Sequence, residues 1–157
     1  MTFDGLMDAH GPALRALLRH LCRRPQDVDD VWQETALRVW RSLHKRPWLR
    51  DPRAWLATIA YRATLDHAAR QPVVASEAGD RADHASPTAH DVAVLAERRL
   101  QVRHALAALP AESRALVALH YTAGLSLRET AAALGLPVGT VKSRLHAALN
   151  TLRGELE

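Results

Sequence analysis

Apolar residues recur at every third or fourth position along most of this chain, and that spacing predicts helices. An N-terminal set should contain helices over residues 3–21, 27–43 and 52–69, with prolines marking the boundaries between them. Helical spacing resumes at residue 92, and no stretch shows the alternation typical of strands. The pattern therefore predicts an all-α fold of two small helical domains, residues 1–70 and 92–157, joined by residues 71–91.

The joining segment, residues 71–91, differs from both flanks in composition. It has few large apolar residues after Val74 and is rich in Ala, Asp, Ser and Pro. Such a segment buries too little apolar surface to fold by itself, so we expect a flexible linker. Fully extended, its roughly 20 residues would reach about 70 Å.

The pattern from Leu125 to Arg153 predicts two short helices joined by a tight turn. Ser126 and Glu129 have the spacing of a capping box, and Gly135 suits the left-handed conformation that ends a helix. The second helix has an apolar stripe and an opposite face of small, polar and basic residues, which favours a helix-turn-helix with a recognition helix for a DNA groove. A plain antiparallel helix pair with a solvated charged face stays open. The stripe consists of Val141, Leu145, Ala148 and Leu152.

Composition limits the classes of protein to consider. Of 157 residues, 48% are hydrophobic but only 4% aromatic, and Cys22 is the single cysteine, so no internal disulfide can form. A reducing cytoplasm is the simple interpretation. No apolar stretch approaches the roughly 20 residues that span a bilayer, and the N-terminus does not read as a signal peptide. We therefore expect a cytoplasmic protein without membrane insertion.

Charge is distributed unevenly around the net value of +4. Residues 1–70 carry +4 and residues 96–157 carry +3, whereas residues 71–95 carry −3. Two basic ends suit a polyanionic partner such as DNA, which would repel the acidic middle.

Catalytic and metal-binding patterns do not stand out in the sequence. His20 and Cys22 are two residues apart, a spacing that places them on different faces of a helix. Phosphate-binding loops, zinc-protease motifs and nucleophile elbows are missing as well. We therefore expect a protein that is not an enzyme and holds neither a metal nor another cofactor.

One family brings these features together. The segment LGLPVGTVKSR, Leu134–Arg144, closely resembles the promoter-reading helix-turn-helix of extracytoplasmic-function (ECF) sigma factors of bacterial RNA polymerase, and a motif this short is also similar to that of some response regulators. Residues 105–126, 27–41 and 51–66 resemble further blocks of the same sigma factors, in the family's order.

The resemblance implies a sigma factor that binds core RNA polymerase, through the β′ clamp coiled coil and the β flap, and directs promoter recognition and transcription initiation. Residues 1–70 would form a region 2-like domain that binds core polymerase and the −10 element. Residues 92–157 would form a region 4-like domain that binds the −35 element. The elements lie about 17 base pairs, or roughly 58 Å, apart, a span that a stretched linker and the two domains could cover together. An anti-sigma factor is a further partner that the family implies.

The same resemblance assigns candidate site residues. On the helix over 27–43, a leucine stands within a charged face, and the residues expected to bind core polymerase are Asp30, Gln33, Glu34, Leu37, Trp40 and Arg41. Those expected at the −10 element are Trp48, Arg50, Arg53, Thr58, Tyr61, Arg62 and Asp66. Those expected at the −35 element are Arg128, Thr140, Lys142, Ser143, Arg144 and His146.

The sequence departs from the family at two of these sites. Tyr61 and Arg62 stand where Arg-Asn is common, and Ala147 stands where an arginine is frequent. Two other functions stay open: a stand-alone helix-turn-helix regulator, which would bind duplex DNA without polymerase and usually as a dimer, and a domain that mainly sequesters another protein.

Overall fold

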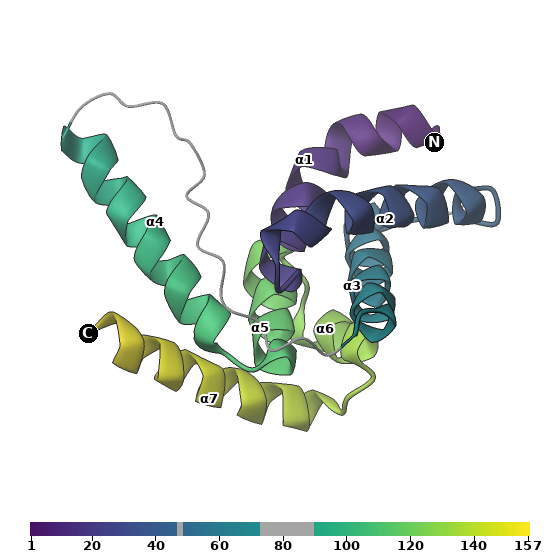
Figure 1. Cartoon of the computed structure of the whole chain (residues 1–157). Helices are drawn as coiled ribbons and strands as arrows, with labels where there is room; N and C mark the ends of the chain where they lie inside the picture. The colour runs from purple at the N-terminus through teal and green to yellow at the C-terminus, as the bar shows by residue number, and fades with distance from the viewer. Residues whose placement is uncertain (47–48, 73–89) are drawn as a thin grey trace.

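The computed structural model describes residues 1–46, 49–72 and 90–157, and all regular structure within these ranges is helical (Figure 1). This confirms the predicted all-α fold. A 3₁₀ turn, Pro25–Asp27, precedes α2, and a π-helical turn, Ala118–Thr122, continues α5. The helices are α1 (Phe3–Leu21), α2 (Val28–Leu43), α3 (Pro52–Arg70), α4 (His90–Ala108), α5 (Ala111–Val117), α6 (Leu127–Leu134) and α7 (Val138–Leu156).

Local capping chemistry explains where several helices begin and end. The Asp51 carboxylate accepts hydrogen bonds from the backbone N–H groups of Arg53 (3.1 Å) and Ala54 (3.3 Å) at the start of α3. At α6 the predicted capping box is present: Ser126 Oγ accepts from the Glu129 N–H (3.1 Å), and the Ser126 N–H donates to the Glu129 carboxylate (3.0 Å). Gly135 ends α6 with φ +68°, as expected.

The expected helix boundaries hold to within about two residues. Helix α1 has the expected ends, whereas α2 begins one residue late because residues 25–27 form the 3₁₀ turn. Helix α4 begins two residues earlier than residue 92. Residues 73–89, most of the expected linker, lie outside the described residues.

Helices α1, α2 and α3 pack together as an N-terminal bundle. The Thr35 hydroxyl is completely buried there and donates to the Val31 carbonyl (2.7 Å), which satisfies it within its own helix. The bundle's most deeply buried apolar side chains come from all three helices: Leu17, Leu18, Val31, Val39, Leu56, Ala60 and Ala63.

Helices α5, α6 and α7 form a C-terminal bundle with the end of α4, whose other residues point away from the rest (Figure 1). Val141, Leu145 and Ala148 are buried, and Leu152 packs against them half-buried, which confirms the stripe expected on α7. The other buried residues in the core of the C-terminal bundle are Leu109, Leu116, Val117 and Ala131.

The two bundles are also in contact with each other. Helix α1 packs against α5 and the π-helical turn, and α3 packs against α6. Leu119, Leu125 and Ala133 are buried in one apolar cluster with residues of the N-terminal bundle. Helical periodicity did not reveal this contact, because an apolar residue can equally be buried within its own domain.

Cys22 should react very slowly with thiol reagents in the folded protein. Burial, followed by the nearby Asp27 carboxylate, raises the pKa of its thiol from 9.0 to about 11. At neutral pH this lowers the reactive thiolate fraction by about a hundredfold, and burial further limits access. Absorbance at 412 nm with Ellman's reagent should show slow labelling of native protein and rapid labelling in guanidinium. Equal rates would contradict a buried Cys22.

Candidate nucleic-acid interface

The turn between α6 and α7 presents the polar face of α7 outward. Burial of Val141 and Leu145 fixes the rotation of the helix, so that Lys142, Ser143, Arg144 and His146 are exposed and Thr140 is half-buried. Arg128, at the start of α6, is exposed as well. The structure thus brings the six residues expected at the −35 element to two adjacent helices, which is the arrangement that a groove-reading helix needs.

Arg144 has an ion-pair partner that the sequence did not suggest. Its guanidinium donates to the carboxylate of Glu112, at the start of α5, and both side chains are partly exposed. An exposed pair of this kind contributes little to stability, but it orients the guanidinium. The two residues are 32 positions apart in the sequence, so no local pattern predicted the pair.

The residues expected at the −10 element lie at different depths. Arg50, Arg53 and Arg62 are exposed and cationic, whereas Trp48 lies outside the described residues. Thr58 is half-buried, and its hydroxyl donates to the Ala54 carbonyl of its own helix (2.8 Å). In this conformation, the accessible members of the described set are these three arginines and Asp66.

Tyr61, one of the residues expected to contact the −10 element, is buried in this structure. Only 9% of the residue is exposed. Helices α1 and α2 cover one side of α3, and the C-terminal bundle covers another. The face of α3 that carries Tyr61 is therefore buried. Burial, followed by the charge of Glu112, raises the pKa of the Tyr61 hydroxyl, which indicates that the start of α5 is close by.

Arg38, which the sequence did not single out, links α2 to α3. Its guanidinium pairs with Glu34 (2.7 Å) on its own helix and with Asp66 (2.8 Å) on α3. The hydrogen bond from Arg38 holds the pKa of Glu34 below its ordinary value. The Asp66 carboxylate therefore has a structural partner, and Glu34 is less available than its neighbours on α2.

The outer face of α2 carries two exposed apolar side chains one turn apart. Leu37 is 42% exposed and Trp40 is 62% exposed. The residues expected beside them, Asp30, Gln33 and Arg41, are exposed too. Large apolar side chains with a polar rim are typical of a protein-binding surface.

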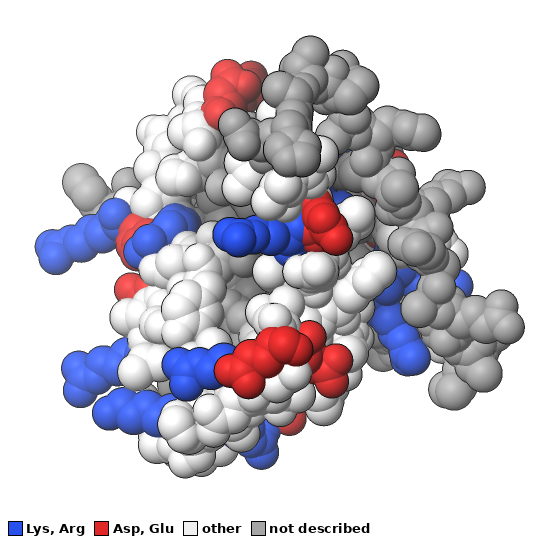
Figure 2. All heavy atoms as spheres, turned by 90° about the vertical axis from the view of Figure 1, so that its left-hand side faces the viewer, with Lys and Arg blue, Asp and Glu red and all other residues white. Residues whose placement is uncertain are grey.

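Helix α4 carries further exposed apolar side chains, distributed around the helix, which the sequence analysis missed. The side of the molecule that carries α4 shows Lys and Arg interspersed with Asp and Glu over a largely uncharged surface (Figure 2). It is therefore no continuous basic face for DNA. The exposed apolar side chains of α4 are Val92, Val94, Leu95, Leu100 and Val102.

Within the described ranges, none of the helices combines the length and the apolar content that a bilayer crossing requires.

Comparison with known proteins identifies the two bundles. Residues 6–72 match the model of sigma-70 region 2, and residues 99–152 match that of sigma-70 region 4. The chain is 36% identical over 158 residues to the ECF RNA polymerase sigma factor SigL of Mycobacterium tuberculosis, covering 97% of this chain and 87% of the relative. It is 28% identical to the ECF RNA polymerase sigma factor RpoE of Cereibacter sphaeroides, covering 97% and 84%.

Solved structures agree with these matches. The sigma factor RpoE from Bartonella quintana, in complex with the anti-sigma factor NepR, superimposes with a TM-score of 0.77 at 25% identity, covering 98% of this chain and 96% of the other. CnrH, in complex with the cytosolic domain of CnrY, gives a TM-score of 0.66 at 28% identity, covering 98% and 86%. The chain therefore belongs to the ECF sigma factors, the RNA polymerase subunits that direct promoter recognition and transcription initiation.

Proposed function

We propose that this sigma factor divides promoter recognition between its two bundles. Residues 1–70 bind core polymerase and the −10 element, residues 92–157 bind the −35 element, and residues 71–91 join them. The observation that carries this proposal is the recognition helix α7, whose apolar stripe is buried while most of its polar and basic face is exposed. The chain acts as a non-catalytic specificity subunit in the cytoplasm, where it meets the polymerase.

At the −35 element, Arg144 and Lys142 supply the charge. Both can donate to phosphates or to the O6 and N7 acceptors of guanine in the major groove. Thr140, Ser143 and His146 add shorter polar contacts from the same helix, and Arg128 anchors a phosphate from α6. The Arg144 guanidinium, which pairs with the Glu112 carboxylate in this structure, exchanges that partner for the DNA.

At the polymerase, the exposed pair Leu37 and Trp40 provides the apolar centre of the contact with the β′ clamp coiled coil. Its polar rim consists of Asp30, Gln33, Glu34 and Arg41. The exposed apolar residues of α4 are the surface in the C-terminal bundle best suited to the β flap.

At the −10 element, Arg50, Arg53 and Arg62 form the cationic part of a single-strand site. Trp48 and Tyr61 are proposed as stacking platforms, and Tyr61 requires that the C-terminal bundle move away first. Thr58 and Asp66 contribute indirectly, through the backbone of α3 and through Arg38.

Replacing Arg144 with Ala should reduce promoter-dependent transcription by roughly 5- to 150-fold, because a good contact to a base or phosphate is worth about 1–3 kcal/mol. Run-off transcription with purified core polymerase, on templates selected by binding to the holoenzyme, measures this. Arg153→Ala is the matched control, since Arg153 is exposed on the last turn of the same helix.

Several outcomes would contradict the proposal. Promoter-dependent transcription that is unchanged by Arg144→Ala would show that Arg144 makes no contact with the −35 element, and the absence of such a transcript with wild type and core enzyme would favour a protein that mainly sequesters a partner. A gel shift of duplex DNA by the isolated protein, with a dimer in size-exclusion chromatography and no transcript with core enzyme, would favour a stand-alone regulator.

A further inference from the structure

Helix α3 carries a carboxylate within the basic part of its exposed surface. Asp66 stands one turn after Arg62 and one turn before Arg70, and all three residues are exposed. Positions four apart share a helix face, so the carboxylate lies between two arginines. A negative charge at this place repels the phosphates of a DNA strand, and it has to be neutralised if the face is to bind one.

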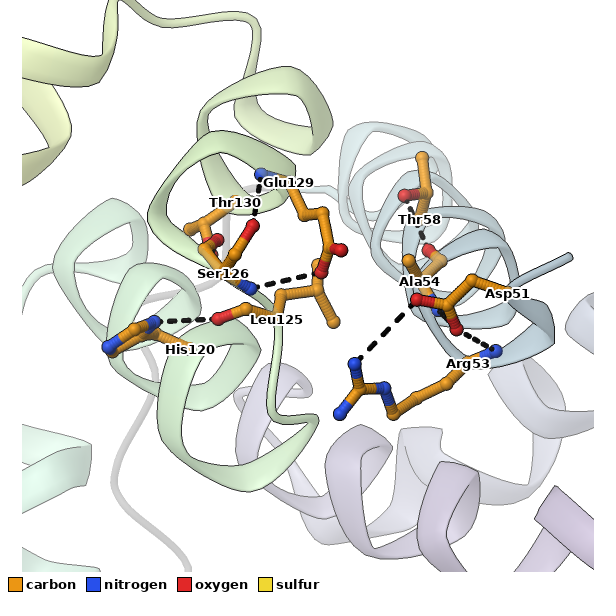
Figure 3. A network of polar contacts seen from close by, with 9 residues as sticks. All are labelled: Asp51, Arg53, Ala54, Thr58, His120, Leu125, Ser126, Glu129 and Thr130. Atoms are coloured by element: carbon orange, nitrogen blue, oxygen red, sulfur yellow. Dashed lines mark hydrogen bonds and ion pairs between the residues drawn. The ribbon is translucent and has the colours of Figure 1, made fainter.

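The carboxylate at the start of α3 is used by the helix itself. Asp51 accepts from the backbone N–H groups of Arg53 and Ala54, and it pairs with the Arg53 guanidinium (3.6 Å), as Figure 3 shows. Asp66 stands in the body of the helix, where the backbone N–H groups are bonded within the helix. Its neighbour Arg70 donates to the Asp66 backbone carbonyl (3.2 Å). The Asp66 carboxylate therefore needs a cation from another helix.

Arg38 on α2 supplies this cation. In the described part of the chain, it is the residue that pairs with the Asp66 carboxylate (Nη1 to Oδ2, 2.8 Å). Its Nε donates at the same time to Glu34 (2.7 Å), one turn earlier on α2. Although burial by itself lowers the pKa of a guanidinium, these two hydrogen bonds raise the pKa of Arg38. Ion pairs near the surface add little to stability, so the main consequence of the pair is the charge that it neutralises.

We infer that Arg38 is a positioning residue for promoter binding: it neutralises the Asp66 carboxylate and holds it towards α2, so that the exposed face of α3 stays basic for the −10 strand. The inference rests on the −10 role proposed for α3. Arg38 acts through Asp66 and does not itself contact the DNA. Because the same guanidinium also pairs with Glu34, its loss frees a carboxylate on the polymerase-binding face of α2 while it weakens the DNA-binding face of α3.

Arg38→Met removes the cation and keeps an apolar stem of similar length. The probe is a labelled single strand, the non-template −10 strand of a template selected by binding to the holoenzyme. Fluorescence anisotropy, with excess unlabelled scrambled strand, measures its affinity for the reconstituted holoenzyme. This affinity should fall about fivefold or more at low salt, and the loss should shrink at higher salt because screening weakens the repulsion. The affinity of the variant for core polymerase should not fall, since Glu34 is then unpaired.

The double substitution of Arg38→Met with Asp66→Asn separates this role from the alternatives. Asparagine has the shape of aspartate without its charge, so the double variant should regain a strand affinity within about twofold of the wild type. Asp66→Asn alone should also stay within about twofold, because its charge is already neutralised in the wild type. Arg19→Met removes an exposed arginine from the last turn of α1. It is the control and should change neither the strand affinity nor the core affinity.

A double variant that binds the strand as weakly as Arg38→Met would overturn the inference, since Arg38 would then contact the DNA or support the fold. Strand binding by Arg38→Met equal to that of the wild type would overturn it as well, and so would equal losses of strand and core affinity. If Arg38→Met does not fold, Arg38→Gln, which is neutral and polar, takes its place with the same expected results. A wild-type holoenzyme that binds the −10 strand no better than the scrambled strand would contradict the proposed function instead.

Discussion

The double substitution Leu37→Asp and Trp40→Ala should weaken binding to core RNA polymerase by at least about 100-fold, while the protein stays folded. Apolar anchors at the centre of an interface each contribute about 1.4 kcal/mol or more, so losing both costs at least roughly 2.7 kcal/mol. Leu37 and Trp40 are 42% and 62% exposed, so neither belongs to the core of the α1–α3 bundle. Fluorescence anisotropy of labelled protein titrated with core enzyme measures the loss.

The matched control is Leu156→Asp, in the last turn of α7. Leu156 is 46% exposed, close to the value for Leu37, but it lies in the other bundle. Its substitution by Asp should leave the affinity for core enzyme within about twofold, since isolated surface changes usually have small effects. Equal losses in the two proteins would show that α2 is not the docking helix.

Leu116→Ala should lower the free energy of unfolding by about 2–5 kcal/mol, the range for removing a large buried side chain and leaving a cavity. Leu116 is completely buried among α5, α6 and α7. Because a domain's total stability is only about 5–15 kcal/mol, this loss should also lower the midpoint of thermal unfolding clearly. Urea denaturation followed by circular dichroism at 222 nm gives the free energy.

For this second prediction, Leu100→Ala on α4 is the control. Leu100 is 41% exposed, so its truncation removes little buried surface and should change the free energy of unfolding by less than about 0.5 kcal/mol. A Leu116→Ala protein with wild-type stability would mean that this part of the core contributes little to holding the C-terminal bundle together.

Features that depend on neighbours in the sequence were predicted well. The capping box of Ser126 and Glu129, the glycine at the end of α6 and the stripe on α7 all depend on residues within a few turns of one another. The exposure of Leu37 was also predictable, because a leucine on the charged face of a helix points away from the bundle into which the apolar face packs. The family resemblance, based on such local blocks, is confirmed by the comparisons.

Features that depend on distant residues were missed. The burial of Tyr61 needs a second bundle against α3, and the Arg144–Glu112 and Arg38–Asp66 pairs join different helices. Periodicity shows which face of a helix is apolar but not how many neighbours cover it. The assignment of individual residues to DNA or polymerase stays a prediction, because it depends on contacts outside the chain.

The leucines shared by the two bundles link the thermal behaviour of the halves. Separate modules melt in separate steps, whereas modules that bury common side chains lose them in one cooperative transition. Leu119 and Leu125, buried with the N-terminal helices, thus make each half a stabilising ligand of the other. A destabilising substitution in either half should then lower the stability of the whole chain.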